Sequence, residues 1–171
     1  MDRKTKIAFG GGCHWCTEAV FQSLIGVEKV AQGFLASINE NNTFSEAVIV
    51  TFNSDEIPLK TLVEIHLHTH KSTSQHSMRK KYRSAVYVYP ENKKIEIQQI
   101  IDDLQDDFEQ EIITQILDFK EFKSSENQFK DYYYSSPEKP FCKTFINPKL
   151  KFLLTHFSKQ VNTEKLNITT T

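Results

Sequence analysis

The chain mixes two hydrophobic periods, one typical of strands and the other typical of helices. Short apolar or alternating runs bounded by turn residues indicate strands, and they lie at residues 6–9, 27–36, 47–52, 83–89 and, more weakly, 113–117. Apolar positions three and four residues apart indicate helices, and they lie at residues 14–24, 59–68, 92–108 and 149–157. The elements do not alternate regularly, and no internal repeat is present. The pattern predicts an α+β fold, a two-layer sandwich of a mixed or antiparallel sheet with helices on one face.

Polar stretches and prolines mark the connections between these elements. The run Asn-Glu-Asn-Asn at residues 39–42 predicts a hairpin turn between the second and third strands. Pro58 suits the first turn of a helix, since its missing N–H is not needed there. After Glu121 the chain has three prolines, which oppose long helices until residue 149. We therefore expect this segment to wrap over the core as irregular chain.

The length of 171 residues suits one domain with an ordinary hydrophobic core. We expect a single domain over residues 1–158. The polar end of the chain lacks hydrophobic periodicity, so we expect residues 159–171 to form a disordered tail.

The composition argues against several classes of partner. The formal net charge is −1, so no overall field would attract nucleic acid or an anionic membrane. No apolar run approaches the roughly 20 residues needed to span a bilayer. Three cysteines without a signal peptide argue against a disulfide framework and favour a reducing compartment, the cytoplasm. We expect a monomer with no nucleic-acid or membrane partner.

The strongest candidate for chemistry is Cys13. An apolar strand leads into three glycines at residues 10–12, and helical periodicity follows Cys13. This order places the thiol at a helix N-terminus, where free N–H groups and the helix dipole stabilise an anion. A cysteine in that position has a lowered pKa and spends more time as the nucleophilic thiolate. The alternative, a small buried hydrophobic residue, is common for free cysteine, but the glycine turn favours a reactive thiol.

Residues 12–18, Gly-Cys-His-Trp-Cys-Thr-Glu, resemble the Gly-Cys-Phe-Trp-x-x-Glu signature of the peptide methionine sulfoxide reductase A family. Further resemblances follow in the family's order, and together they cover roughly residues 7–150. Gly33-Phe34 falls where the family has Gly-Tyr, and residues 46–50 resemble the strand with the family's catalytic glutamate. Residues 81–87 resemble the family's Gln-Tyr-Arg-Ser strand. Residues 131–133, 140–142 and 148–149 resemble one common C-terminal ending of the family.

The resemblance implies a ferredoxin-like α+β fold and a thiol reductase without metal or cofactor. The implied reaction reduces the S-sulfoxide of methionine, free or in proteins, and leaves Cys13 as a sulfenic acid. A sulfenic acid condenses with a nearby thiol, so a second cysteine would complete the cycle. Thioredoxin or a similar dithiol protein is the implied electron donor.

Two cysteines could serve as the second thiol. Cys16 is three residues from Cys13, a spacing at which thiols in a first helical turn can pair. Cys142 lies in the proline-rich segment, where many family members keep a recycling cysteine. We favour Cys16 because it reaches Cys13 whatever the C-terminal segment does, and a relay through both remains open.

Glu46 and Tyr82 are the candidate partners of the sulfoxide oxygen. Glu46 begins an apolar strand, and partial burial would favour its neutral form, which can donate a proton. An exposed edge-strand glutamate and a packing tyrosine are the plainer interpretations, and the resemblance favours the catalytic ones. Trp15, beside the nucleophile, could pack against the substrate methyl group or simply against its own helix.

The sequence departs from the family pattern at several of these positions. Phe34 lacks the hydroxyl that a second family tyrosine would supply. His14 replaces a phenylalanine in the expected substrate wall and brings a charge that changes near pH 6–7. Ser77 stands where the family has an aspartate. These changes put efficiency and substrate preference in question more than the reaction type, and they also motivate the hypothesis of a methionine-sulfoxide binding protein with weakened catalysis.

Two other interpretations concern single motifs of the chain. The Cys13-His14-Trp15-Cys16 motif could belong to a dithiol–disulfide oxidoreductase, but the βαβ start of that fold is absent. His66, His68 and His70 could join the two cysteines at a metal, but the spacing differs widely from that of a zinc finger. Histidines at a helix end are more often capping or surface groups, so we expect no metal site.

Overall fold

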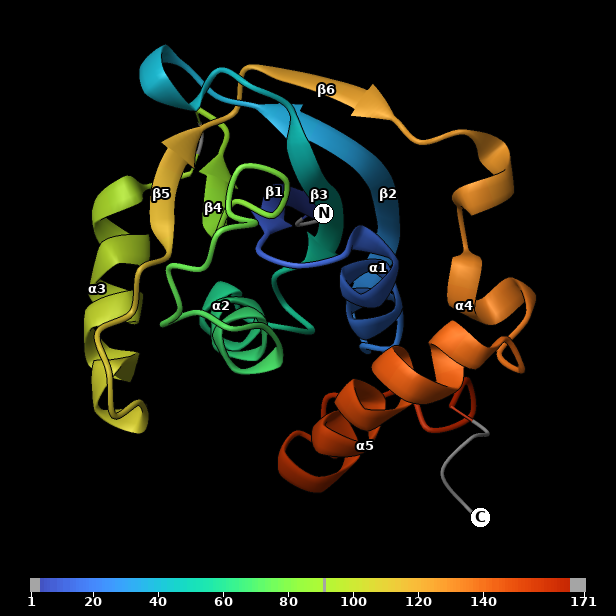
Figure 1. Cartoon of the computed structure of the whole chain (residues 1–171). Helices are drawn as coiled ribbons and strands as arrows, with labels where there is room; N and C mark the ends of the chain where they lie inside the picture. Colours follow the sequence, from blue (N-terminus) through green and yellow to red (C-terminus); the bar gives the residue numbers. More distant parts are fainter. Residues whose placement is uncertain (1–3, 91, 167–171) are drawn as a thin grey trace.

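A six-stranded sheet forms the centre of the computed structural model, which describes residues 4–90 and 92–166 (Figure 1). The strands are β1 (Lys4–Gly10), β2 (Val27–Ala36), β3 (Ser45–Asn53), β4 (Ala85–Val88), β5 (Gln115–Asp118) and β6 (Glu121–Ser124). Their order in the sheet is β5-β4-β1-β3-β2-β6. Strands β4 and β5 are parallel, and the other neighbours are antiparallel. The sheet is therefore mixed, as the sequence predicts.

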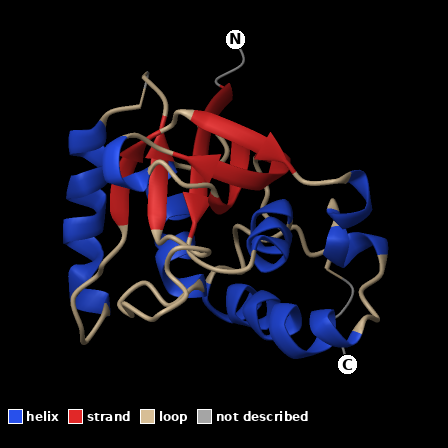
Figure 2. Cartoon of the chain, turned by 45° about the horizontal axis from the view of Figure 1, so that its top comes forward, coloured by secondary structure: helices blue, strands red, loops and turns tan. Residues whose placement is uncertain are grey.

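The described residues form five α-helices beside the sheet. Most of them lie to one side of it (Figure 2). They are α1 (His14–Gln22), α2 (Leu59–Thr69), α3 (Lys94–Leu104), α4 (Tyr132–Ser135) and α5 (Asn147–His156). None of the helices in the described ranges is long and apolar enough to cross a membrane. The succession β1-α1-β2-β3-α2-β4 with the sheet order β4-β1-β3-β2 is the split βαβ arrangement of ferredoxin-like folds. The α+β prediction is confirmed.

Both faces of the central strands are buried. Ile7 and Phe9 of β1 face the main core, which they share with the buried sides of the helices. Ala8, between them, faces a smaller core with Leu35 and Tyr87. Successive side chains of a strand point to opposite faces, so a strand buried on both sides reads as an uninterrupted apolar run. This explains why the sequence before the glycine turn lacks alternation.

The structure corrects two predictions for the second half of the chain. Residues 121–124 form strand β6, which pairs with β2 and brings Phe122 opposite Leu35. The expected disordered tail is packed as far as Leu166: Val161 bridges to Leu24, and both Val161 and Leu166 are buried. Residues 167–171 of that tail lie outside the described residues. The C-terminal segment is therefore held against the domain.

The carboxylate of Glu18 fastens the C-terminal segment to α1. Its side chain is buried and accepts hydrogen bonds from the backbone N–H groups of Asp131 and Tyr132, at 3.1 and 3.2 Å. The side-chain amide of Gln32 donates a third, at 3.0 Å. Burial raises the pKa of this carboxyl, and the three donors oppose that shift. A single acidic residue thus joins α1, β2 and the start of α4.

Candidate active site

Cys13 is the N-cap of α1, as the sequence predicts. Its carbonyl oxygen accepts hydrogen bonds from the N–H groups of Cys16 and Thr17, at 3.1 and 3.2 Å, which closes the first helical turn. Gly11 in the preceding turn has φ +155°, and a Cβ there would lie 2.4 Å from the His70 ring. Only glycine can occupy this position without strain. The turn and the helix start together fix the direction of the Cys13 side chain.

The pKa of Cys13 is lowered, and the largest cause is a hydrogen bond from the thiol of Cys16. The backbone N–H groups of Trp15 and Cys16 lower it further, as expected at a helix N-terminus. Partial burial and the negative charge of Glu46 act in the opposite direction. The sequence predicts the direction of this shift, but it does not reveal that the neighbouring thiol contributes most.

The other two cysteines have raised pKa values. Cys16 is buried, and its hydrogen bond to Cys13 is the first cause of its shift, followed by burial. Cys142 lies at the start of η4 (Cys142–Ile146), one turn of π-helix, and donates to the carbonyl oxygen of Ser136 at 3.6 Å. Burial raises its pKa, and its charge contributes to the shift of Cys16. All three thiols are free, and Cys13 is the most acidic of them.

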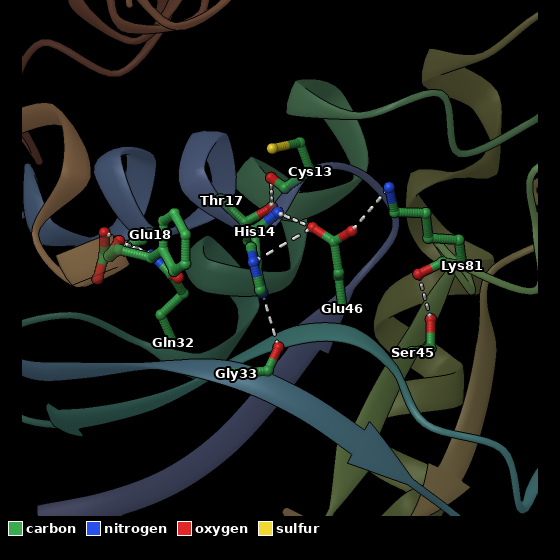
Figure 3. A network of polar contacts seen from close by, with 10 residues as sticks. Cys13, His14, Thr17, Glu18, Gln32, Gly33, Ser45, Glu46 and Lys81 are labelled. Atoms are coloured by element: carbon green, nitrogen blue, oxygen red, sulfur yellow. Dashed lines mark hydrogen bonds and ion pairs between the residues drawn. The ribbon is translucent and has the colours of Figure 1, made fainter. Parts of the chain in front are cut away.

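Glu46 lies beside Cys13 with 6% of its surface exposed. Its Oε1 accepts a hydrogen bond from the backbone N–H of His14 at 3.2 Å and lies 3.3 Å from Nε2 of the same residue (Figure 3). Its Oε2 lies 3.7 Å from Nζ of Lys81. Lys81 also lies over the ring of Tyr82, 5.2 Å from its centroid. Lys81 therefore contacts both of the residues that are predicted to bind the sulfoxide oxygen. This role of Lys81 is not predicted from the sequence.

His14 and Phe34 lie on the same side as Glu46. The imidazole of His14 is buried, with Nδ1 2.7 Å from the carbonyl oxygen of Gly33. The ring of Phe34 meets it edge-on at 5.0 Å between centroids. Phe34 is paired with Glu46 in the β2–β3 register and is 37% exposed. Burial is the first cause that lowers the pKa of His14.

An open cavity of about 510 Å³ begins at Cys13 and Cys16. Tyr82 and Ser77 border it, together with the apolar side chains of Met78, Phe141 and Phe145 and the charged side chains of Lys71 and Lys149. Glu46 is not among its lining residues. The structure thus brings Cys13 and Tyr82 to one cavity and places Glu46 next to Cys13, outside that cavity.

The side chain of Trp15 packs against the C-terminal segment. Its ring stacks on Tyr132 at 4.1 Å with an interplanar angle of 6°, and it meets Phe141 edge-on at 5.2 Å. It borders neither cavity that reaches Cys13. The reason is that the second residue of α1 faces the C-terminal segment, which covers it. Trp15 therefore anchors the segment that carries Cys142.

Cys13 and Cys16 also border a second, small cavity of about 20 Å³, which is lined in part by His66, His70 and Lys149. His66 is buried, contrary to the prediction of a capping or surface group, and donates from Nε2 to the carbonyl oxygen of Gly10 at 2.8 Å. Burial lowers its pKa to about 3. The ammonium of Lys149 donates to the carbonyl oxygen of Thr69. In the described ranges, no group of three His, Cys, Asp or Glu side chains is placed to hold a metal ion.

Known proteins resemble this chain in sequence and in fold. A family model described as peptide methionine sulfoxide reductase matches residues 5–162. The peptide methionine sulfoxide reductase MsrA of Trichodesmium erythraeum is 31% identical over 172 residues, covering 91% of this chain and 97% of that protein. Among solved structures, Mxr1 of Saccharomyces cerevisiae in reduced form superposes with a TM-score of 0.72 at 19% identity, covering 84% of this chain and 91% of that one. Mxr1 in complex with Trx2 superposes with a TM-score of 0.60 at 22% identity, covering 74% and 84%. The chain therefore belongs to the peptide methionine sulfoxide reductase family of oxidoreductases.

Proposed function

We propose that this protein reduces the S-sulfoxide of methionine, free or within a polypeptide, with Cys13 as the nucleophile. The Cys13 thiolate takes the oxygen of the sulfoxide together with one proton, and methionine leaves. The sulfoxide sulfur is reduced by two electrons, and the Cys13 sulfur is oxidised to a sulfenic acid. The observation that carries this proposal is the lowered pKa of Cys13 at the N-cap of α1, beside the buried carboxyl of Glu46.

Glu46 and Tyr82 are the proposed partners of the sulfoxide oxygen. The closeness of Glu46 to Cys13 supports proton donation to an oxygen held between them. Tyr82 borders the cavity at Cys13 and is linked to Glu46 through Lys81. Phe34 and His14, whose rings are in contact, are the proposed substrate-binding residues beside Glu46, and Phe34 carries no hydroxyl. The apolar part of the cavity would accommodate the chain that carries the sulfoxide.

Cys16 is the proposed recycling thiol. It attacks the Cys13 sulfenic acid, a Cys13–Cys16 disulfide forms, and water leaves. The existing hydrogen bond between the two side chains supports this choice, and Cys142 beside Cys16 supports a relay through a second disulfide. Thioredoxin or a similar dithiol protein would then supply two electrons and two protons. The complex of Mxr1 with Trx2 supports this kind of donor.

Further parts of the proposal follow from the thiol chemistry. It needs no metal and no cofactor, and it suits a reducing compartment such as the cytoplasm. One domain over residues 1–158 would carry all the groups named, and a monomer would suffice. The segment after residue 158 would then add packing rather than chemistry.

The test is incubation of the protein and dithiothreitol with a mixture of the two methionine sulfoxide diastereomers, followed by chiral HPLC. We expect the S form to be consumed and methionine to appear, and the Cys13→Ser variant to be inactive because a hydroxyl is a far weaker nucleophile. Turnover by that variant would contradict the assignment. The alternative is a dithiol–disulfide oxidoreductase. It would be favoured if the wild type formed no methionine and if the wild type and Glu46→Gln reduced insulin disulfides equally well.

A further inference from the structure

The tautomer of His14 follows from its partner on β2. Nδ1 lies 2.7 Å from the carbonyl oxygen of Gly33, a group that can only accept a hydrogen bond. Nδ1 therefore carries a hydrogen and donates it to Gly33. In the neutral imidazole the lone pair is then on Nε2.

Nε2 lies 3.3 Å from Oε1 of Glu46. If both groups were fully deprotonated, this contact would bring together two lone pairs. A proton between the two atoms turns it into a hydrogen bond, either from a carboxyl to neutral imidazole or from imidazolium to carboxylate. Each residue is only 6% exposed, so water cannot easily replace that hydrogen bond.

We propose that His14 Nε2 and Glu46 Oε1 hold one proton between them and deliver it to the sulfoxide oxygen. The proposal rests on the proposed reductase function and adds to it a residue, His14, that decides whether the proton is available. Glu46 and His14 then act as one acid, whose titration belongs to the pair and not to either residue alone.

The surrounding charges are consistent with a neutral pair. The negative charge of Glu46 raises the pKa of Cys13, so a proton kept in the pair removes that opposition to the thiolate. Burial lowers the pKa of His14, and the negative charge of Glu46 acts in the opposite direction. Lys81 is the other charged group that faces the pair, 3.7 Å from Oε2. Its positive charge also lowers the pKa of His14.

Phe34 explains why such a pair would be needed. Its ring contacts His14 edge-on and offers no hydroxyl to an oxygen bound here. In the reaction, the Cys13 thiolate, the sulfoxide and the pair's proton become the Cys13 sulfenic acid and methionine. The pair is left with a carboxylate and a neutral imidazole, and it takes up a proton from water before the next cycle.

The first test is an NMR titration of the wild-type protein without substrate. We expect the ¹⁵N signal of His14 Nδ1 to remain that of a protonated nitrogen. The signals of His14 Nε2 and the Glu46 carboxyl carbon should move with one shared midpoint. Separate midpoints, or an unprotonated Nδ1, would overturn the shared proton. This measurement needs neither activity nor a variant.

The second test is the pH dependence of the single-turnover rate in His14→Phe. Without Nε2, Glu46 keeps Lys81 and loses the base that retains its proton, so we expect the alkaline limb to move to lower pH. The methionine-forming rate should fall about tenfold near pH 8, equivalent to about one pKa unit, and much less near pH 5.5. An unchanged pH profile would overturn delivery by the pair.

His68→Phe is the matched control for this substitution. His68 also contacts a carboxylate, Asp107, at 3.2 Å, but this partly buried pair borders neither of the cavities at the thiols. We expect its profile to equal that of the wild type. If the wild type forms no methionine, the proposed function fails, and the delivery of the proton fails with it. The NMR midpoints decide separately whether His14 and Glu46 share a proton.

Discussion

The thiol of Cys16 donates a hydrogen bond to the sulfur of Cys13, and this contact does more than any other to lower the pKa of Cys13. The same contact raises the pKa of Cys16. In the proposed cycle, the Cys16 thiol therefore activates Cys13 first and attacks its sulfenic acid afterwards. This double role leads to a prediction that separates activation from recycling.

Replacing Cys16 with Ala removes the hydrogen bond, whereas Cys16→Ser keeps a donor in place. We expect the pKa of Cys13 to rise in the Ala variant and to change less in the Ser variant, as measured by the pH dependence of iodoacetamide alkylation in a Cys142→Ser background. Both variants should complete one turnover and then fail with thioredoxin. Equal alkylation profiles in all three proteins would show that Cys16 does not activate Cys13.

Peptide mapping of the substrate-oxidised wild type identifies the thiol that resolves the sulfenic acid. We expect a Cys13–Cys16 disulfide, because two thiols in one helical turn come near the roughly 5.5 Å Cα separation that a disulfide prefers. Cys142 donates to Ser136 within the C-terminal segment and must move to reach Cys13. A Cys13–Cys142 link without any Cys13–Cys16 species would contradict this choice and leave the reductase proposal intact.

Glu46→Gln keeps the size of the side chain and removes its proton. We expect the methionine-forming step to slow by roughly 10²–10⁴-fold, the usual contribution of a positioned general acid. Rapid-quench measurement of methionine formed in the first turnover checks this. Glu56→Gln, an exposed change beyond β3, is the control and should behave like the wild type. A first turnover of normal rate would make Glu46 a structural residue.

The unit from β1 through the glycine turn to α1 could be predicted because its signals are local. A strand run, three glycines and helical spacing follow one another within residues 7–25, so the position of Cys13 needs no long-range information. The short strand β6 could not be predicted. It pairs on one side only, with β2, and its sequence Glu-Phe-Lys-Ser has a single apolar residue to mark it.

The partners within the site depend on contacts between distant segments. The tautomer of His14 depends on Gly33, and its contact with Glu46 depends on the pairing of β2 with β3. Likewise, Trp15 faces Tyr132 because the C-terminal segment returns to α1. Hydrophobic periodicity carries no information on such returns. The candidate residues could therefore be named from the sequence, but not their orientations.

His66 makes stability depend on pH. Its pKa is about 3 in the folded protein because of burial, against about 6.5 when unfolded. Below about pH 6.5 the unfolded chain binds a proton that the folded one refuses, so stability present at neutral pH is lost as the pH falls toward 3. The loss from this group is at most about 1.4 kcal/mol per pH unit. Urea midpoints at pH 7 and pH 5 should differ less in His66→Gln, which can still donate to Gly10, than in the wild type. The exposed change His156→Gln should leave that difference unaltered. An equally steep dependence in His66→Gln would assign it to other groups.

Lys149 is a cation beside the proposed recycling thiol, Cys16. It borders the small cavity together with Cys13 and Cys16, and its charge lowers the pKa of Cys16. In the described ranges no carboxylate forms an ion pair with it, so a thiolate at Cys16 would supply the anion that a partly buried ammonium lacks. Lys149→Met keeps most of the stem and removes the charge. We expect disulfide formation after the first turnover to slow by roughly tenfold, equivalent to about one pKa unit.

Quenched-flow thiol counting measures this disulfide formation separately from the release of methionine. Lys151→Met, the same change on the exposed side of α5, should match the wild type. If Lys149→Met slowed methionine formation instead, its charge would act on Cys13 and not on Cys16.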